Sequence, residues 1–337
     1  MSNRLESKTA EIFLASIAEI APFLKEDGVT EVMVNAGSDV WVERRGVMEK
    51  TSAIINPVSM RGAIMTLARL SNQDARENSK DAIINARFDD LRIAAVLAPT
   101  AVDGHAMCIR KHTRSDMRLS DYEKSGAFQR QRPNHAQDES EDVIFPGETL
   151  SDYFVRLIKA RKNILVSGGT GTGKTTFVNA LLAEIPENER VLTIEDTVEL
   201  NVRVPNKIRL LSNASAGIPT RDLLRLALRM RPDRVIVGEV RGEEAFDLLQ
   251  ALNTGHDGGF ATLHANDARL ALTRLESMVM LGVPAGGNWP IDAIRMQIAS
   301  CITHVVHIKR DGNRRFISEI LAVEGYRSGD YICKRIF

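Results

Sequence analysis

The chain has 337 residues, which at roughly 100 to 200 residues per domain predicts two domains with separate cores. Its 44 basic and 44 acidic side chains balance, so the sequence lacks the cationic field of a protein that binds bulk DNA. Three scattered cysteines, Cys108, Cys301 and Cys333, exclude a disulfide scaffold and a CxxC zinc knuckle and suit a reducing compartment. No apolar run reaches the roughly 18 residues of a membrane span and the N-terminus lacks a secretory signal, so we expect a cytoplasmic protein.

The first 125 residues predict a small α+β domain without internal repeats. Apolar residues at helical spacing favour helices, whereas alternating apolar and polar residues favour strands. The expected helices lie at residues 12–24 and 60–70, and the expected strands at residues 29–35, 39–46, 91–97 and 107–111. The first two of these strands are close enough in sequence to form a hairpin.

A polar segment follows, with the sequence GAFQRQRPNHAQDESE from Gly126 to Glu141. It contains Pro133, lacks hydrophobic periodicity and lies between a basic stretch and an acidic one, so it predicts an exposed linker. We place the linker at residues 126–146 and a second domain at residues 147–337. The alternative is a long surface loop within one domain.

The second domain alternates short apolar runs with helical patterns of about ten residues. The runs NILVSGG, VLTIED, DRVIVGEV and GFATLHA are separated by TTFVNALLAEI, RDLLRLALRM and EEAFDLLQAL. Such alternation predicts an α/β fold with a mostly parallel sheet and helices on both faces. The last residues, 304–336, alternate around the turn-forming sequences DGN and SGD, which predicts antiparallel strands at the end of the domain.

A glycine-rich segment, Gly168 to Thr175, matches GxxxxGK[ST] and lies between a predicted strand and a predicted helix, as this phosphate-binding motif requires. Its backbone N–H groups and the helix N-terminus would bind phosphate oxygens, and Lys174 would neutralise the β- and γ-phosphates. The Thr175 hydroxyl would bind Mg²⁺. The alternatives, an incidental glycine-rich turn or a dinucleotide site, fit the Gly-Lys-Thr sequence less well.

Carboxylates follow two of the predicted strands. Glu195 and Asp196 end VLTIED, with Glu199 three residues further on, and this cluster suits a metal ion and water. Glu239 ends the strand DRVIVGEV and is the candidate general base that would orient the attacking water. Gly238 precedes it, where an aspartate commonly binds the metal, so Mg²⁺ would depend more on Thr175 and on carboxylates acting through water.

A third strand end carries His264, whose imidazole could hydrogen-bond a γ-phosphate or report its loss. His256 is as well explained by a structural role. Phosphoryl transfer also gains from an arginine at the transferring group. Arg92, Arg110 and Arg241 are candidates, although for each of them a solvated surface position explains the sequence equally well.

Four sequence segments, in chain order, resemble the motifs of the type II/type IV secretion ATPases. They are GGTGTGKT (Walker A), TIEDTVEL (Asp box), LALRMRPDRVIVGEVRG (atypical Walker B) and GHDGGFATLHAND (His box). The N-terminal segments VTEVMVNAGSDVWVERRG and LRIAAVLAPTAVDGHAMCIRKH are similar too, so the resemblance covers nearly the whole chain except the linker. The sequence is most similar to the conjugative-transfer, TrbB-like branch, because it lacks the paired zinc-binding cysteines common in type II members.

The resemblance implies a RecA-like C-terminal domain that binds and hydrolyses ATP with Mg²⁺. It implies catalytic roles for Lys174, Glu195, Glu239 and His264, and charge-stabilising roles for Arg92 and Arg110. The nucleotide would bind to Gly168, Gly169, Thr170, Gly171, Thr172, Gly173, Lys174, Thr175 and Thr176. The metal would bind near Thr175, Glu195, Asp196 and Glu239.

The resemblance further implies a hexameric ring at the cytoplasmic face of the inner membrane, bound to inner-membrane components of a secretion machine. ATP turnover would power substrate translocation or pilus assembly in a type IV secretion or conjugal transfer system. The alternatives are a type II secretion or type IV pilus assembly ATPase, a RecA-like nucleic-acid motor, a nucleotide-gated scaffold and a small-molecule kinase. The neutral charge argues against stable nucleic-acid binding, and the amphipathic N-terminal stretch leaves peripheral membrane association open.

Overall fold

The computed structural model describes residues 11–35, 39–71, 73–77, 79–88, 91–111, 117–128, 144–145, 147–213, 216–284, 287, 289–312 and 314–337. The chain folds into two compact units, Met1–Thr113 and Arg114–Phe337. The first unit has the mixed α+β composition expected of the N-terminal domain, and the second contains all of the strands and helices expected of the α/β domain.

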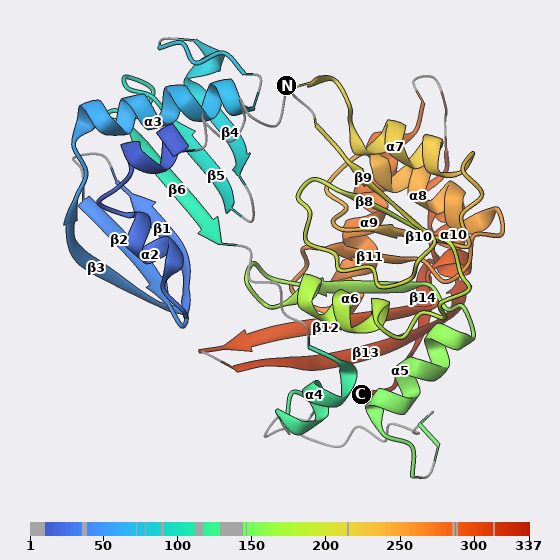
Figure 1. Cartoon of the computed structure of the whole chain (residues 1–337). Helices are drawn as coiled ribbons and strands as arrows, with labels where there is room; N and C mark the ends of the chain where they lie inside the picture. The colour runs from blue at the N-terminus through green and yellow to red at the C-terminus, as the bar shows by residue number, and fades with distance from the viewer. Residues whose placement is uncertain are drawn as a thin grey trace. The chain divides into compact units, whose positions relative to one another are not determined.

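The first unit is built on a six-stranded antiparallel sheet with the strand order β3-β2-β1-β6-β5-β4 (Figure 1). Its strands are β1 (Val29–Val34), β2 (Asp39–Arg44), β3 (Val47–Ile54), β4 (Ile83–Phe88), β5 (Leu91–Val96) and β6 (Ala106–Lys111). Its helices are α2 (Ala21–Lys25), α3 (Pro57–Leu70) and the short 3-10 helix η1 (Lys80–Ala82). The predicted hairpin of β1 and β2 is confirmed.

Helix α3 starts where the sequence provides a cap. The Asn56 side chain accepts a hydrogen bond from the Val58 N–H over 2.8 Å, and Pro57 stands at the first position, where its missing N–H costs nothing. The buried face of α3 shares one core with the alternate apolar residues of the sheet. The expected helix over residues 12–24 is instead two helical segments, 11–16 and α2, because Pro22 starts a new helix.

The second unit contains an eight-stranded sheet with the order β14-β13-β12-β7-β11-β10-β8-β9. Its strands are β7 (Ile164–Gly168), β8 (Val191–Glu195), β9 (Lys207–Leu211), β10 (Arg234–Val237), β11 (Phe260–Leu263), β12 (His304–Asp311), β13 (Arg314–Arg327) and β14 (Asp330–Arg335). The strands from β12 to β9 are parallel, whereas β13 and β14 pair antiparallel. The predictions of a parallel sheet and of antiparallel strands at the end are both confirmed.

Helices cover both faces of this sheet. They are α4 (Leu119–Lys124), α5 (Leu150–Lys159), α6 (Lys174–Leu182), α7 (Thr220–Ala227), α8 (Glu244–Asn253), α9 (Ala268–Gly282) and α10 (Ile291–Cys301) (Figure 1). Ile164 and Val166 of β7 pack in one core with α5 and α6, while Leu165 between them packs in the other core with α7 to α10. The alternation along a central strand therefore divides the apolar residues between two layers.

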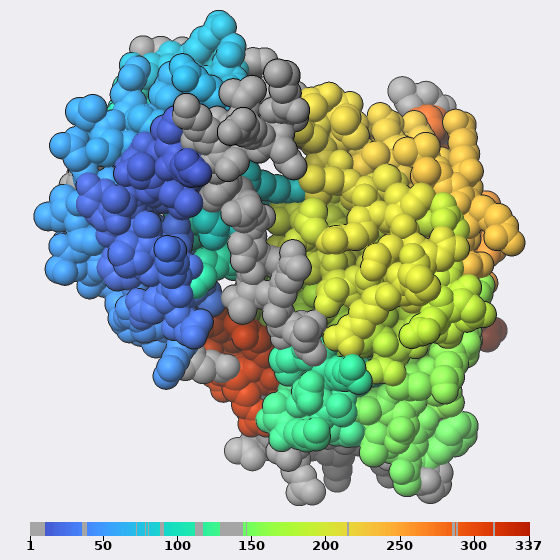
Figure 2. Space-filling model, in the orientation of Figure 1, coloured from blue at the N-terminus to red at the C-terminus, as the bar shows by residue number. Residues whose placement is uncertain are grey.

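Helix α4 lies in the second unit, although the sequence placed the end of the N-terminal domain at residue 125. Its Leu119 and Tyr122 are buried in the core shared with α5 and α6. The Tyr122 ring lies 5.6 Å from Phe128 and 5.5 Å from Phe177 of α6. Figure 2 shows α4 (teal) and α5 (green) packed side by side on the surface of this unit. Most of the proposed linker, residues 129–143, lies outside the described residues.

Candidate functional site: the loop after β7 and the carboxyl ends of β10 and β11

The glycine-rich loop joins the end of β7 to the start of α6 at the carboxyl edge of the parallel sheet. We call residues 168–176 the phosphate loop. Gly173 caps α6 with a φ of 93°, in the left-handed region that favours glycine. A Cβ on Gly168 would lie 2.5 Å from the carbonyl oxygen of Ile308, so no larger residue fits. The backbone is thus held in a compact turn in front of a helix N-terminus, which is suited to anion binding.

Lys174 is 8% exposed, and its ammonium lies against the phosphate loop. Its Nζ donates hydrogen bonds to the carbonyl oxygens of Gly168 and Gly169, both over 3.0 Å. Burial lowers the pKa of Lys174 and the nearby Glu239 carboxylate opposes this shift. A desolvated cation beside backbone amides would attract a phosphate group strongly.

Glu239 follows β10 and is held by two neighbouring side chains. Its Oε2 lies 2.7 Å from Nη2 of Arg241, and its Oε1 lies 3.2 Å from Nε2 of His264. The same guanidinium pairs with Asp196, with 3.0 Å between Nη1 and Oδ2. Burial raises the pKa of Glu239, but the hydrogen bond and charge of Arg241 outweigh it and bring the pKa below its usual value. Glu239 is therefore a carboxylate in a fixed orientation.

His264, directly after β11, joins Glu239 to Lys174. Its Nδ1 lies 3.4 Å from Nζ of Lys174, and a lysine ammonium can only donate hydrogen bonds. The neutral tautomer with its proton on Nε2 satisfies both contacts, because Nδ1 then accepts from Lys174 and the Nε2–H faces Glu239. Burial and the charge of Lys174 lower the pKa of His264, in agreement with a neutral imidazole.

Glu195 is placed differently from the two carboxylates that Arg241 binds. It is 3% exposed, and its Oε1 accepts hydrogen bonds from the N–H groups of Glu199 and Leu200, both over 2.7 Å. Burial raises its pKa to about 7. A Cβ on Gly238 would lie 3.2 Å from Cγ of Glu195, so Glu195 fills the space in which a larger residue at 238 would stand. A larger residue at 238 would therefore require the Glu195 side chain to shift.

Oxygen donors for a cation come from two sides of the loop. Thr175 is the second residue of α6 and is half-buried, and Asp196 and Glu239 provide carboxylates. Hydroxyl and carboxylate oxygens are hard ligands, and Mg²⁺ commonly takes one or two of them beside phosphate oxygens and water, so this donor set fits Mg²⁺. Within the described part of the chain, no three His, Cys, Asp or Glu side chains form a metal-binding cluster.

The remaining three candidates are on other elements of the fold. Arg92 and Arg110 face each other on β5 and β6 of the first unit, and Nη2 of Arg110 lies 3.4 Å from Oε1 of Glu31. Their role at the phosphates stays a prediction. His256 precedes β11, at the opposite end of that strand from His264, and its Nδ1 lies 3.2 Å from the carbonyl oxygen of Ala251.

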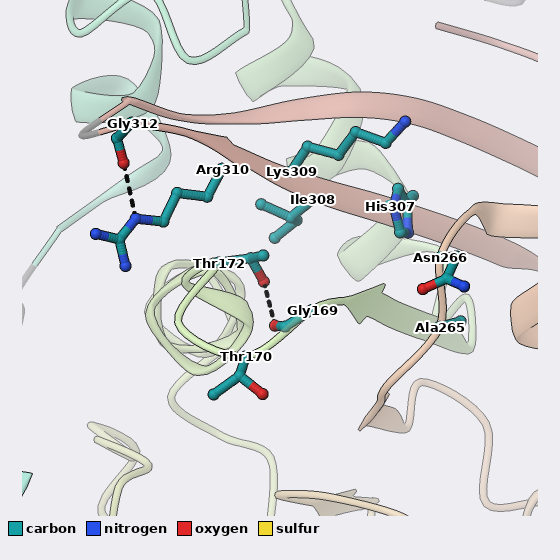
Figure 3. Close-up of a pocket in the computed structure, with 10 residues that line it drawn as sticks. All are labelled: Gly169, Thr170, Thr172, Ala265, Asn266, His307, Ile308, Lys309, Arg310 and Gly312. Atoms are coloured by element: carbon teal, nitrogen blue, oxygen red, sulfur yellow. Dashed lines mark hydrogen bonds between the residues drawn. The ribbon is translucent and has the colours of Figure 1, made fainter. Parts of the chain in front are cut away.

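A cavity of about 490 Å³ adjoins the phosphate loop on the side of β12 (Figure 3). Thr170 and Thr172 line it from the loop, and His307, Lys309 and Arg310 line it from β12. Thr172 Oγ1 donates to the carbonyl oxygen of Gly169 over 2.9 Å, as Figure 3 shows. Space for a ligand therefore exists directly beside the loop.

The sequence was compared with known families and proteins. The profile of the type II/IV secretion system protein family matches residues 14–311. The chain belongs to this family. It is 30% identical to the type IV secretion system protein VirB11 of Bartonella quintana, over 94% of this chain and 95% of that protein. It is also 30% identical to the conjugal transfer protein TrbB of Rhizobium radiobacter, over 91% of this chain and 88% of that protein.

Among solved structures, that of the pilus retraction motor PilT with bound ADP shares the fold, with a TM-score of 0.59 and 18% identity over 89% of this chain and 81% of that one. Family membership confirms the predicted secretion ATPase and its RecA-like C-terminal domain, so the chain is an ATP-hydrolysing enzyme that binds nucleotide. In the described residues, no helix combines the length and apolarity needed to cross a bilayer.

Sequence reasoning missed how this secretion ATPase arranges its arginines. Arg241 was one of several candidates, and no local pattern showed that it joins Asp196 to Glu239. Arg315 of β13, which donates to the carbonyl oxygen of Gly171 over 3.0 Å, is not among the predicted site residues. The signal that could have indicated Arg241 is its position two residues after a strand-end carboxylate. Nothing in the sequence indicated Arg315.

Proposed function

We propose that this chain is the Mg²⁺-dependent motor of a type IV secretion or conjugal transfer system. ATP hydrolysis would drive domain motion that powers substrate translocation or pilus assembly. The observation that carries the catalytic part is the line of contacts from Lys174 through His264 to Glu239 beside the phosphate loop. The names of the relatives VirB11 and TrbB support the secretion part.

In this proposal the phosphate loop, residues 168–176, binds the triphosphate through its N–H groups, and Lys174 binds the β- and γ-phosphates. Glu239, oriented by Arg241, accepts a hydrogen bond from the attacking water and directs it at the γ-phosphorus. His264 donates from Nε2 to Glu239 or, after γ-phosphate binding, to a phosphate oxygen. Asp196 keeps Arg241 in place, and Glu195 holds the backbone at residues 199–200.

Mg²⁺, when bound, would neutralise charge on the β- and γ-phosphates. Thr175 would provide its hydroxyl, and Asp196, Glu239 and Glu195 would contribute carboxylates, directly or through water. Arg92 and Arg110 of the first unit would stabilise the charge of the transferring group. The motor would be a homo-hexamer at the cytoplasmic face of the inner membrane, in contact with inner-membrane components of its secretion machine.

Phosphate release from ATP by the full-length protein, measured with Mg²⁺ and with excess EDTA, tests this function. We expect turnover that requires Mg²⁺ and that Lys174→Ala abolishes, because the removed ammonium belongs to the loop and is hydrogen-bonded to two of its carbonyl oxygens. Lys159→Ala, at an exposed residue of α5, is the control and should retain full turnover. Full turnover by Lys174→Ala would refute the site.

Size-exclusion chromatography with light scattering, with and without Mg-ATP, tests the hexamer. Turnover that single-stranded DNA stimulates strongly would favour the nucleic-acid motor instead. Transfer of the labelled γ-phosphate to a small molecule, without release of inorganic phosphate, would favour a kinase.

A further inference from the structure

The hairpin of β12 and β13 lies on one side of β7, the strand that leads into the phosphate loop, and β11 and β10 lie on the other side. Arg315 of β13 donates from Nε to the carbonyl oxygen of Gly171 over 3.0 Å. The methylene stem of the same side chain lies against Gly173, where an added Cβ would be 3.1 Å from Cδ of Arg315. One side chain thus contacts two residues of the loop.

The contact has a geometric consequence for the next peptide group. A trans peptide is planar, and its C=O and N–H point in opposite directions. Because the Gly171 carbonyl points toward Arg315 of the hairpin, the N–H of Thr172 is turned away from the hairpin. Thr172 is itself fixed, since its Oγ1 donates to the Gly169 carbonyl over 2.9 Å. The orientation of one N–H donor of the loop therefore depends on the hairpin.

A second cation stands next to the same peptide. Arg310 of β12 is the direct cross-strand partner of Arg315, and an added Cβ on Gly171 would lie 3.3 Å from Nη1 of Arg310. Like charges directly opposite each other on a hairpin are destabilising. Two guanidinium groups beside one loop become favourable when an anion is bound there.

The geometry points to Arg315 as a positioning residue for nucleotide binding, which sets the Thr172 N–H toward the phosphates through its hold on the Gly171 carbonyl. This role rests on the proposed nucleotide site at the phosphate loop. Arg315 itself would not contact the reacting atoms. The hairpin would then contribute to nucleotide affinity through its contact with the loop that binds the phosphates.

The test measures ADP affinity by calorimetry, together with the KM and kcat of ATP hydrolysis, for the full-length protein. We expect Arg315→Ala to weaken ADP binding and raise the KM for ATP about tenfold, the usual size for one lost hydrogen bond to a charged group. Because the loop binds the ground state and the transition state alike, kcat should stay within about twofold. Arg315→Lys, which keeps a charged donor, should recover most of the affinity.

Arg314→Ala is the matched control, because Arg314 is the adjacent residue of the same hairpin and points to the other face of the strand. It donates to the carbonyl oxygen of Gly126 over 3.1 Å, so its loss should affect thermal stability and leave ADP affinity unchanged. Wild-type ADP affinity in Arg315→Ala, or an equal loss of affinity in Arg314→Ala, would overturn the role of Arg315. If Arg315→Ala does not fold, Arg315→Met gives the same comparison, because it keeps an unbranched stem and has no hydrogen-bond donor. Failure of the unaltered protein to bind ADP would instead refute the proposed nucleotide site.

Discussion

Arg241 donates to Glu239 over 2.7 Å and at the same time contacts Asp196 over 3.0 Å, so one guanidinium fixes the orientation of the carboxylate expected to aim water. An unpaired carboxylate at a strand end would sample several rotamers, and most of them would not orient water for attack on the γ-phosphate. The short arginine contact also stabilises the ionised form of Glu239, the form that can accept a proton. The strength of the general base is thus linked to an arginine two residues away.

Replacement of Arg241 should therefore reduce the rate of ATP hydrolysis more than it reduces the affinity for ATP. We expect Arg241→Ala to lower kcat between about 10- and 100-fold with a small change in KM, since a misplaced catalytic group costs rates of this size. Arg241→Lys should restore part of the rate, because it keeps the charge but only one of the two contacts. Steady-state ATPase kinetics measures both parameters. A kcat within about twofold of the unaltered value would mean that Glu239 needs no support from Arg241.

Glu239→Gln should separate binding from hydrolysis. The amide keeps the size of the side chain but cannot accept the proton of water, so kcat should fall at least about 100-fold while ADP affinity stays unchanged. Glu187→Gln changes a carboxylate at an exposed position in the same unit and should have no effect. Single-turnover hydrolysis combined with ADP binding measures the two effects. Equal losses in binding and hydrolysis would assign Glu239 a structural role.

Arg234 provides a test of stability that is independent of catalysis. It is fully buried and pairs with Glu189, and it also donates to the carbonyl oxygens of Ile158 and Gly258 over 2.8 and 3.3 Å. Arg234→Met would leave a buried carboxylate without its main partner, so we expect the free energy of unfolding to fall by about 3 kcal/mol. Denaturant titration of the full chain measures this change.

The control for Arg234 is an exposed ion pair. Arg61 lies 2.9 Å from Glu77 and its side chain is 51% exposed, so Arg61→Ala should cost less than about 1 kcal/mol. Similar losses in the two variants would show that burial of Arg234 adds nothing to the stability.

The free energy of unfolding should depend on pH because His307 is buried. Burial, together with the charges of Lys309 and Lys174, lowers its pKa to about 4, and its Nδ1 contacts the Ser167 hydroxyl over 2.9 Å. The unfolded chain takes up a proton near pH 6.5, so between pH 6.5 and 4 it binds more protons than the folded chain, and stability falls as the pH is lowered. At pH 5 this loss is about 2 kcal/mol.

His307→Gln should remove that part of the acid destabilisation. We compare the free energies of unfolding of the variant and of the unaltered protein at pH 8 and at pH 5. On going from pH 8 to pH 5, the variant should gain about 2 kcal/mol of stability relative to the unaltered protein. Denaturant curves at the two values of pH measure the shift. A difference that does not change with pH would contradict a depressed pKa at His307.

The sequence predicts those features of the fold and the site that are formed by residues adjacent in the chain. The phosphate loop was predictable because its glycines, Lys174 and the flanking strand and helix are adjacent in the chain. The contact between Gly171 and Arg315 spans more than 140 residues, and no periodicity marks it. The burial of Arg234 could not be predicted for a different reason: arginines are seldom buried, and only the tertiary structure supplies its partners.

Two further differences have physical causes of the same kind. Helix α4 has only six residues, too few for a periodic pattern, and its assignment to the second unit depends on where Leu119 and Tyr122 pack. Glu195 ends a strand as the motif requires, yet it is buried and accepts two backbone N–H groups, which its spacing in the sequence did not reveal.

The ring contact between Tyr122 and Phe177 has a mechanical consequence. Phe177 is in the first turn of α6, the helix that begins with Lys174, and Tyr122 belongs to α4, the first helix of the second unit within the described residues. Closely packed protein interiors have low compressibility, so they transmit small displacements between neighbouring elements. A displacement of α6 would therefore move Tyr122 and the rest of α4 with it, so the helix that follows the phosphate loop and the helix that precedes α5 would respond together.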